Sequence, residues 1–552
     1  MSNLESKHWN TTRIVTVISL TCLSLYVLTY QNVGSPTEHQ NVISSKEILN
    51  GEMSVFLDSQ MQDCIGNTAN KSIAKPVTSA RFSRIKITES GSSNVINLLI
   101  RTFNARNTTK SYGGDLLVVL GYQINGDGKV VGKVVDHKNG SYTGQLELWW
   151  TGQTRVKIKI GAMFENTCLR YSAIEKYGLS VYVMKNVWGI RGRYKAPGLE
   201  EYTPCSASAY VYGVRDFCNY TNNNDGMSWF CGRPENKSIS CNDIFTFHSG
   251  QFMSFIPIMP HVEKHEKIVS PTVAYMKESF VVNVSNVKEV SWQQNNSCKT
   301  RPKRDTWRDI YEFPSGFWIN GTWICFSCFS NSFHSAVSYR KCLNGKRMYI
   351  LGDSTIRQYA EYFINTVLEY KPRIDLRRFG PDRTYHFRKT FYKYGINVVY
   401  LKHAMPFTNH NAPIKEITGF VTELEAIASS NITDSQIIII AGYHAHFQLY
   451  PLAVYRGRIR KLVKSFTRLL TVKPSAQLFF KGPTFTFDDT HWFDNKMSIT
   501  YMEIAFQEFA PLHNHVTFLD TWSPSVTLET SGIHPVNKAF QALIQQFMAY
   551  LC

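Results

Sequence analysis

The chain has 552 residues, of which 43% are hydrophobic and 18% are charged. The length predicts several domains, at ~100–200 residues each, and the composition excludes wholesale disorder, collagen and a coiled coil. The 60 Lys and Arg residues outnumber the 42 Asp and Glu residues and give a formal net charge of +18. This excess of positive charge indicates an acidic partner, which is nucleic acid, anionic lipid or acidic glycan.

The first recognisable segment is an apolar run over residues 14–30, which contains no charged residue. Its seventeen residues come close to the lower limit for a helix that crosses a bilayer. Lys7 and Arg13 precede the run and the next basic residue is Lys46, so the positive-inside rule places the N-terminus in the cytosol. The segment therefore predicts a type II signal anchor behind a cytosolic tail of residues 1–13.

A cleaved signal peptide, which would leave a secreted protein, is the alternative for this run. The bulky residues Leu28, Tyr30 and Gln31 at its end make a poor cleavage site and favour the anchor. A short span suits the thin membranes of the Golgi or early secretory pathway. The polar residues 31–70 show no clear periodicity and predict a stalk, and the rest of the chain is expected in the lumen.

Glycosylation motifs agree with a lumenal chain, because Asn-x-Ser/Thr acceptors are surface sites of secreted proteins. Lumenal exposure argues against nucleic acid as the acidic partner. It leaves an anionic glycan as the expected partner, with the membrane contacted through the anchor. The nine acceptor asparagines beyond the anchor are Asn70, Asn107, Asn139, Asn219, Asn236, Asn283, Asn295, Asn320 and Asn431.

The twelve cysteines are expected to form mainly disulfides, since eleven of them follow the anchor in an oxidising lumen. Eight lie in the stretch from Cys205 to Cys342, and the odd number beyond the anchor leaves one thiol or one intermolecular bridge. Cys325 and Cys328 have the spacing of a redox or zinc motif. A single such pair is a weak signal, so a structural role is predicted and no metal is expected.

Residues 71–197 predict an N-terminal β-sandwich of immunoglobulin or filamin type. Segments of strand character alternate there with turn signals such as Asn125-Gly126 and Asn139-Gly140. The expected strands cover residues 83–88, 95–102, 115–122, 144–150, 155–161 and 179–183.

Residues 198–304 hold many of the cysteines and few recognisable elements, which predicts a cysteine-rich segment tied by disulfides. The segment ends in the basic run from Arg301 to Arg304, which resembles a proprotein-convertase site. A solvated basic loop is the alternative for this run.

From residue 305 to residue 552, apolar strands alternate with helical patterns, which predicts an α/β domain with a parallel sheet covered on both faces. In such sheets ligands bind at the carboxyl ends of the strands. The whole chain is therefore expected to be an α+β multidomain protein. The expected strands cover residues 347–351, 396–401, 436–441, 477–481 and 516–519. The expected helices cover residues 355–370, 453–471, 495–510 and 535–550.

Two motifs place reactive groups at these strand ends. Ser354 follows Gly352 and Asp353 directly after the first strand, where a helix N-terminus can stabilise an oxyanion. His534 lies between the last strand and the last helix, and histidine is the usual base for a serine nucleophile near neutral pH. Each motif alone has a simpler explanation, since Asp353 or Ser354 can cap a helix and His534 fits a turn. Their joint position predicts a catalytic pair.

These blocks resemble the neurexophilin and PC-esterase domain (NXPE) family. The resemblance rests on GDSTIRQ at residues 352–358, on IHP at residues 533–535 before a helix that ends in Cys552, and on NGSYT at residues 139–143 with Trp-x-Gly after it. It covers most of the chain beyond the anchor. It implies an SGNH-hydrolase-like (PC-esterase) C-terminal domain behind a neurexophilin-like half. Such domains cleave or transfer acyl esters, commonly acetyl groups on glycans.

The resemblance also implies roles for particular residues. Ser354 matches the nucleophile and His534 the general base. In the family pattern the oxyanion is bound by the serine N–H, by a glycine on a second strand and by a polar side chain on a third. Gly442 fits the backbone donor, and His444 or His446 the side-chain donor. Asp353, beside the nucleophile, is expected among the same oxyanion- and substrate-binding residues. The His-x-His spacing also resembles a metal motif, but no neighbouring carboxylate in the sequence completes it and no metal is expected.

One position departs from the family pattern, in which an Asp stands three residues before the histidine. Here that position is Ser531, so the Asp-x-x-His motif is degraded. The carboxylate fixes the imidazole tautomer, and its loss can cost up to ~10⁴ in rate. Ser531 itself, Asp520 or Glu529 is then the orienting group. The simpler explanations are that Asp520 forms a turn at a strand end and that Glu529 is an exposed loop acid.

We expect from this resemblance a lumenal O-acyl, in particular O-acetyl, transferase or esterase that acts on sialoglycans. Arg357, one helical turn after Ser354, is expected to bind the anionic group, unless it forms a surface ion pair. No bound cofactor is expected, and acetyl-CoA is the donor in the transferase case, although the sequence shows no coenzyme A signature. The alternative is a catalytically weak or inactive secretory adhesion or ligand glycoprotein of neurexophilin type, since Ser531 is what a decayed triad would contain.

Overall fold

The computed structural model describes most of the chain beyond residue 76. The predicted anchor (14–30), the stalk (31–70, apart from Cys64) and the strand expected at 179–183 lie outside the described residues, as do Asn70 and Asn295. Among the residues that are described, no helix is long and apolar enough to cross a membrane. The described residues are 64, 77–88, 94–177, 188–207, 216–224, 226–251, 274–287, 297–330, 334–376, 386–403, 414, 419–487 and 493–552.

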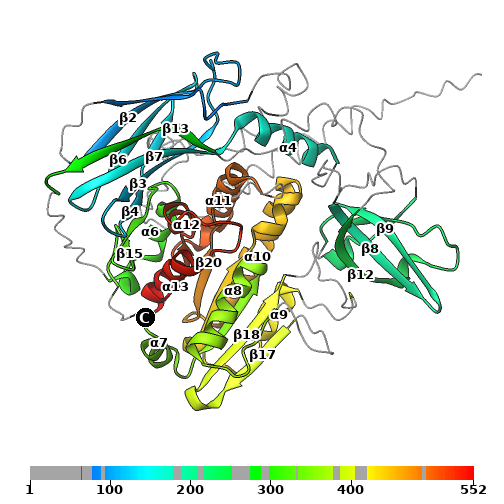
Figure 1. Ribbon diagram of the computed structural model, residues 1–552. Coiled ribbons are helices and arrows are strands. Elements are labelled where there is room, and N and C mark those ends of the chain that lie inside the picture. Colours follow the sequence, from blue (N-terminus) through cyan, green and yellow to red (C-terminus); the bar gives the residue numbers. More distant parts are fainter. Residues whose placement is uncertain are drawn as a thin grey trace, which may run out of the picture. The chain divides into compact units, whose positions relative to one another are not determined.

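Two antiparallel sheets follow in the N-terminal half of the described chain (Figure 1). They share one hydrophobic cluster, to which the first sheet contributes Leu98 and Tyr142 and the second Val119 and Ile158. In β6 every second residue is buried, as expected for a strand with one face on a core. The first sheet has the order β1 (Arg84–Thr88), β2 (Val95–Arg101), β6 (Ser141–Glu147), β5 (Lys133–Asp136). The second has the order β13 (Ala274–Val284), β7 (Gly152–Ala162), β3 (Leu116–Gln123), β4 (Lys129–Val131), β14 (Gly316–Ile319), β15 (Thr322–Cys325).

The strands expected between residues 83 and 161 are confirmed, with shifts of a few residues at their ends. The helix α4 (Phe164–Tyr177), which carries the disulfide-bonded Cys168, was not predicted. Strands β13, β14 and β15 extend the second sheet with residues from much later in the chain. Neither expected boundary, at 197 or at 304, therefore marks where this sheet ends.

The expectation of few elements in residues 198–304 is wrong. A five-stranded antiparallel sheet forms there and in the residues just before it, and two disulfides link its short strands and the turn beside them. Such cross-links compensate for strands too short to bury much apolar surface. The sheet has the order β10 (Phe217–Asn219), β11 (Phe230–Gly232), β9 (Leu199–Ser206), β8 (Trp188–Ala196), β12 (Ile244–Gln251).

The basic run from Arg301 to Arg304 is not a solvated loop. The Arg301 guanidinium is buried and donates to both carboxylate oxygens of Asp309, each at 2.9 Å. Lys303 opens the short helix α6 (Lys303–Thr306). A buried bidentate ion pair and a helical turn are a poor substrate for a convertase, which needs an accessible chain.

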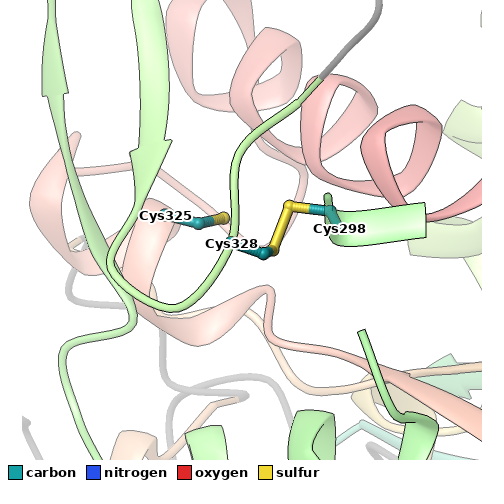
Figure 2. A group of neighbouring side chains, drawn as sticks. All are labelled: Cys298, Cys325 and Cys328. Carbon is teal, nitrogen blue, oxygen red and sulfur yellow. A yellow bond between two sulfur atoms is a disulfide. The ribbon is translucent and has the colours of Figure 1, made fainter. Parts of the chain in front are cut away.

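Five disulfides join the described cysteines, and Cys325 takes part in none of them. The odd number beyond residue 30 thus leaves one thiol, which is buried at the end of β15. Figure 2 shows the Cys325 sulfur directed toward the bridge between Cys298 and Cys328, and the three sulfurs lie within 4.8 Å of one another. The bonds are Cys64–Cys168, Cys205–Cys231, Cys218–Cys241, Cys298–Cys328 and Cys342–Cys552.

The C-terminal half contains a six-stranded sheet with helices around it (Figure 1). All neighbours in it are parallel except β17, which runs antiparallel at one edge. The strand order is β17 (His386–Phe391), β18 (Ile396–Lys402), β16 (Arg347–Gly352), β19 (Ile437–Gly442), β20 (Gln477–Lys481), β21 (Val516–Leu519). The helices are α7 (Ala336–Leu343), α8 (Ser354–Tyr362), α9 (Phe420–Ala428), α10 (Leu452–Val472), α11 (Asn495–Phe509), α12 (Trp522–Thr527) and α13 (Asn537–Leu551).

Helices cover both faces of this sheet. On β16, Tyr349 and Leu351 belong to a hydrophobic cluster with residues of α9, α10 and α11. The alternate residues Met348 and Ile350 belong to a second cluster with residues of α8 and α13. Because successive side chains point to opposite faces, the central strands read as continuous apolar runs, and this is why the sequence predicted them.

Three features of this half were not predicted. The edge strand β17 alternates apolar with basic residues, so it lacks the continuous apolar run of its neighbours. The helices α7, α9 and α12 were missed because they are short, with eight, nine and six residues. The helix expected at 355–370 changes to a π-helical turn at Phe363–Val367 and ends there.

Candidate active site

The carboxyl ends of the parallel strands bring several polar residues together. In the register of the sheet, Gly352 at the end of β16 pairs with Lys402 on β18 and with Gly442 on β19. The residues that follow these three strand ends are therefore at the same edge of the sheet. On β16 this next stretch is Asp353 and Ser354.

Ser354 and His534 form a hydrogen-bonded pair at this edge. Ser354 is the first residue of α8, and its Oγ lies 2.7 Å from Nε2 of His534. Both side chains are partly exposed. The distance is that of a nucleophile and its general base, and the helix N-terminus beside the hydroxyl offers backbone N–H groups to an oxyanion.

Two hydrogen bonds hold the loop that carries His534. Gln358 of α8 donates from Nε2 to the carbonyl oxygen of Pro535 at 2.8 Å. On the other side, Thr484 Oγ1 lies 3.4 Å from the carbonyl oxygen of Ile533. Gln358, the last residue of the GDSTIRQ block, thus holds the loop of His534. The ring of His534 in turn contacts Ser354 at the start of the same helix. The bond from Gln358 links the two motifs in the structure.

Asp353 is a structural residue at the same junction. It is the N-cap of α8, where its Oδ1 accepts from the backbone N–H and the hydroxyl of Thr355 at 2.8 and 2.7 Å. Its Oδ2 accepts from the backbone N–H groups of His444 and Ala445 at 3.2 and 2.9 Å. The buried carboxylate thereby ties the turn after β19 to the start of α8.

The glycine of the motif is required by the close approach of two strands. A Cβ on Gly352 would lie 2.5 Å from the carbonyl oxygen of Gly442, and backbone cannot move away. A Cβ on Gly442 would instead meet side-chain atoms of Ile356 at 3.0 Å. Gly442 is buried at the end of β19, the position predicted for it.

The two histidines proposed as side-chain donors have different surroundings in the structure. His444 is buried, with its Nε2 3.1 Å from Ser498 Oγ on α11, and burial and the charge of Lys481 lower its pKa to about 3. His446 remains partly exposed, and its Nδ1 lies 2.7 Å from Nε2 of His403. Its pKa is also lowered to about 3, by desolvation first and then by the charge of Lys402.

His446 interacts electrostatically with one member of the pair, His534. His534 and Arg357 are among the charges that act on its ring. His444 faces the packing between the turn and α11 instead. Of the two histidines, His446 is therefore the one on whose ring the charge of His534 acts.

The two carboxylates considered as orienters of His534 have other partners. Asp520 is buried, accepts from Ser315 Oγ at 2.6 Å and accepts from the backbone N–H groups of Trp522 and Ser523. Burial raises its pKa. Glu529 accepts from the hydroxyl of Tyr275 and forms an ion pair with Lys129 at 3.4 Å.

Ser531, where the family has the orienting Asp, is exposed. Neither Asp520 nor Glu529 therefore takes over, through the contacts just described, the role of the missing carboxylate.

Two basic residues lie at the same strand ends: Lys402 pairs with Gly352 in the sheet, and Arg357 follows Ser354 on α8. Arg357 Nε lies 3.2 Å from Glu361 Oε1, four residues along α8. Of the two predictions for Arg357, an anion-binding residue or an ion pair, the structure therefore has the ion pair. Lys402 is buried at the end of β18, and desolvation together with the charge of Arg357 lowers its pKa to about 7.

Sequence reasoning missed Lys402, His403 and Lys481. Each follows or closes an apolar strand at the edge where ligands bind, and such a polar ending was the available signal. The buried Lys481 ends β20 and donates to the carbonyl oxygen of Gly482 at 2.9 Å. Burial lowers the pKa of Lys481 to about 8.

Surface exposure agrees with glycosylation at the predicted acceptors. Every acceptor asparagine within the described residues is exposed. These are Asn107, Asn139, Asn219, Asn236, Asn283, Asn320 and Asn431.

Two family models match separate parts of the chain. The model for the NXPE family member 4-like, C-terminal domain matches residues 323–552, which include Ser354 and His534. The neurexophilin model matches residues 98–271, which include most of the N-terminal strands. The neurexophilin match and the disulfides indicate a protein of the secretory pathway.

Proposed function

Because the chain belongs to the neurexophilin and PC-esterase domain (NXPE) family, we propose that its C-terminal half is a serine-dependent acyl-ester enzyme of SGNH type. The observation that carries the proposal is the 2.7 Å contact between Ser354 Oγ and His534 Nε2 at the carboxyl edge of a parallel sheet. The chemistry is that of an ester hydrolase or an acyl transferase, since both use the same pair.

In the reaction, Ser354 Oγ attacks the carbonyl carbon of the acyl group while its proton passes to His534 Nε2. The oxygen of the tetrahedral intermediate is stabilised by N–H groups at the start of α8, with Gly442 and His446 as further donors. The bond from the carbonyl carbon to the leaving group then breaks. With an ester the leaving group is an alcohol whose oxygen His534 protonates, and with acetyl-CoA it is the coenzyme A thiol. Water or a sugar hydroxyl then attacks the acyl-Ser354, and His534 takes its proton. The bond between the acyl carbon and Ser354 Oγ breaks, and His534 returns the proton to that oxygen.

The substrate we propose is a sialoglycan. An esterase would remove its O-acetyl group, whereas a transferase would move an acetyl group from acetyl-CoA to one of its free hydroxyls. Two basic residues at this edge support an anionic ligand: Lys402, which pairs with Gly352 in the sheet, and Arg357, one turn after Ser354 on α8. Arg357 would exchange its ion pair with Glu361 for the ligand. The exposed acceptor asparagines and the disulfides support a lumenal location. We propose a type II anchor in a Golgi or secretory-pathway membrane, and no binding to nucleic acid.

A second candidate is a secretory adhesion or ligand glycoprotein of neurexophilin type. Two observations favour it: the neurexophilin match over residues 98–271, and the engagement of Asp520 and Glu529 with partners other than His534. In that case the pair of Ser354 and His534 would be a remnant with little activity.

The test is acetyl release from O-acetylated sialoglycan, and acetyl transfer from acetyl-CoA, measured with the full chain and with Ser354→Ala. The matched control is Ser429→Ala, at the exposed end of α9. We expect activity in the wild type and the control and none in Ser354→Ala. Absence of both reactions in the wild type, with the fold intact, would support the second candidate.

A further inference from the structure

Two histidines from different strand ends meet beside the reacting pair. His403 directly follows β18, and His446 lies in the 3-10 turn Ala445–Leu449 after β19. His403 Nε2 and His446 Nδ1 are 2.7 Å apart, and the ring centroids are 5.0 Å apart. His403 is buried, whereas His446 keeps part of its surface exposed.

A hydrogen bond between two imidazole nitrogens needs one N–H and one lone pair. Desolvation lowers the pKa of both rings, and the charge of Lys402 acts in the same direction on each. Both rings are therefore neutral near pH 7, and each carries one proton. Two arrangements remain: His403 Nε2–H donates to His446, or His446 Nδ1–H donates to His403.

The surroundings of His403 decide between these arrangements. Within the described residues, His403 Nδ1 is buried and has no hydrogen-bond partner. If His446 were the donor, His403 would carry its proton on Nδ1 and bury an N–H group without an acceptor, which is rare in proteins. If His403 is the donor, only a lone pair is left unsatisfied there, which costs less.

We propose that His403 is a positioning residue that holds His446 in the Nε2–H tautomer, so that His446 donates a hydrogen bond to the oxygen of the reacting ester. The hydrogen bond from His446 to the ester oxygen rests on the proposed function, whereas the tautomer of His446 does not. The position of His446 is fixed relative to the nucleophile, because Asp353 binds the N–H of Ala445 at 2.9 Å and directly precedes Ser354.

The first test is independent of activity. In the full chain labelled with ¹⁵N-histidine, the ring nitrogens of His446 report which of them is protonated, and the signals are assigned by their loss in His446→Gln. We expect a protonated Nε2 and an unprotonated Nδ1 near pH 7, and a shift to a mixture of tautomers in His403→Phe. A protonated Nδ1 in the wild type would overturn the inference and leave the proposed function standing.

The second test uses kinetics. His446→Leu is expected to lower kcat for acetyl release about 100-fold, as for the loss of one oxyanion donor. His446→Gln, whose amide can still donate, should recover part of this loss, and His403→Phe should lower kcat with little change in KM. The control is His334→Gln, which lies elsewhere and contacts Tyr339.

Equal rates for His446→Leu and the wild type would overturn the donor role. An inactive wild type with the expected tautomer would contradict the proposed function and the donor role that rests on it, but not the tautomer.

Discussion

Asp520 accepts a hydrogen bond from Ser315 Oγ at 2.6 Å, across 205 positions of the sequence. Ser315 directly precedes β14, which belongs to the sheet of the N-terminal half. The carboxylate that follows the last strand of the C-terminal sheet is therefore used to join the two halves of the described chain. Asp520 was considered as the carboxylate that orients His534. Its hydrogen bond to Ser315 gives it a structural role instead.

This relationship predicts that Asp520→Asn lowers stability and leaves the site working. The buried carboxylate accepts three hydrogen bonds, and its loss should cost about 1–3 kcal/mol of unfolding free energy. The rate at which a fluorophosphonate labels Ser354 should stay within about threefold of the wild type, because only stability is affected. A large loss of labelling in a variant of unchanged stability would instead make Asp520 the orienter of His534.

The close approach of Gly352 and Gly442 predicts an asymmetry between two similar substitutions. Gly352→Ala drives its methyl group into a backbone carbonyl, whereas Gly442→Ala meets only side-chain atoms, those of Ile356 at 3.0 Å and of Lys481 at 3.3 Å. Gly352→Ala should therefore destabilise the chain by about 1–3 kcal/mol more than Gly442→Ala. Urea unfolding of the two variants measures the difference, and equal stabilities would show that the strand ends can separate.

Lys402 predicts a specific dependence of stability on pH. Its pKa is about 7 in the folded chain and 10.5 for a freely solvated lysine, so the unfolded chain binds this proton more tightly. The unfavourable contribution is complete below about pH 7 and disappears as the pH rises toward about 10.5.

Lys402→Met should therefore be more stable than the wild type near pH 6.5, with the gain shrinking at about pH 9.5. Denaturant titrations at the two pH values measure this, with the exposed Lys393→Met as the control. A gain that is the same at both pH values would contradict the assignment. The same variant should bind sialoglycan more weakly if Lys402 contacts the anionic group.

Features of the fold that depend on neighbouring residues could be predicted from the sequence. Most features that depend on contacts between distant residues could not. The strands at 477–481 and 516–519 were predicted with their observed ends, because a continuous apolar run is visible locally. The proximity of Ser354 and His534 followed from one rule, that parallel strands end at the same edge.

Contacts set by tertiary packing were out of reach. The bond of Asp520 to Ser315 and the pairing of His403 with His446 depend on elements that no local pattern connects. The sheet of β8 to β12 was missed because disulfides stabilise its shorter strands in place of a long apolar pattern.

The buried position of Cys325 predicts that its thiol is unreactive in the native chain. It is buried, and desolvation, followed by the charge of Asp309, raises its pKa to about 12. Because the thiolate is the reactive form, iodoacetamide should not modify Cys325 until the chain is unfolded. Peptide mapping after alkylation, with and without denaturant, measures this. Modification of the native chain at the rate of an exposed thiol would contradict the buried position.

The most direct measurement of the central claim is the site of fluorophosphonate attachment in the full chain. A serine activated by His534 at 2.7 Å should be phosphonylated at Oγ, and the adduct should map to Ser354. Ser354→Ala and His534→Ala should both abolish labelling, and the surface variant Ser429→Ala should not. Labelling of Ser354 that depends on His534 is the predicted result. A folded wild-type chain that takes up no probe, or takes it up at another serine, would contradict the assignment of Ser354 as a nucleophile.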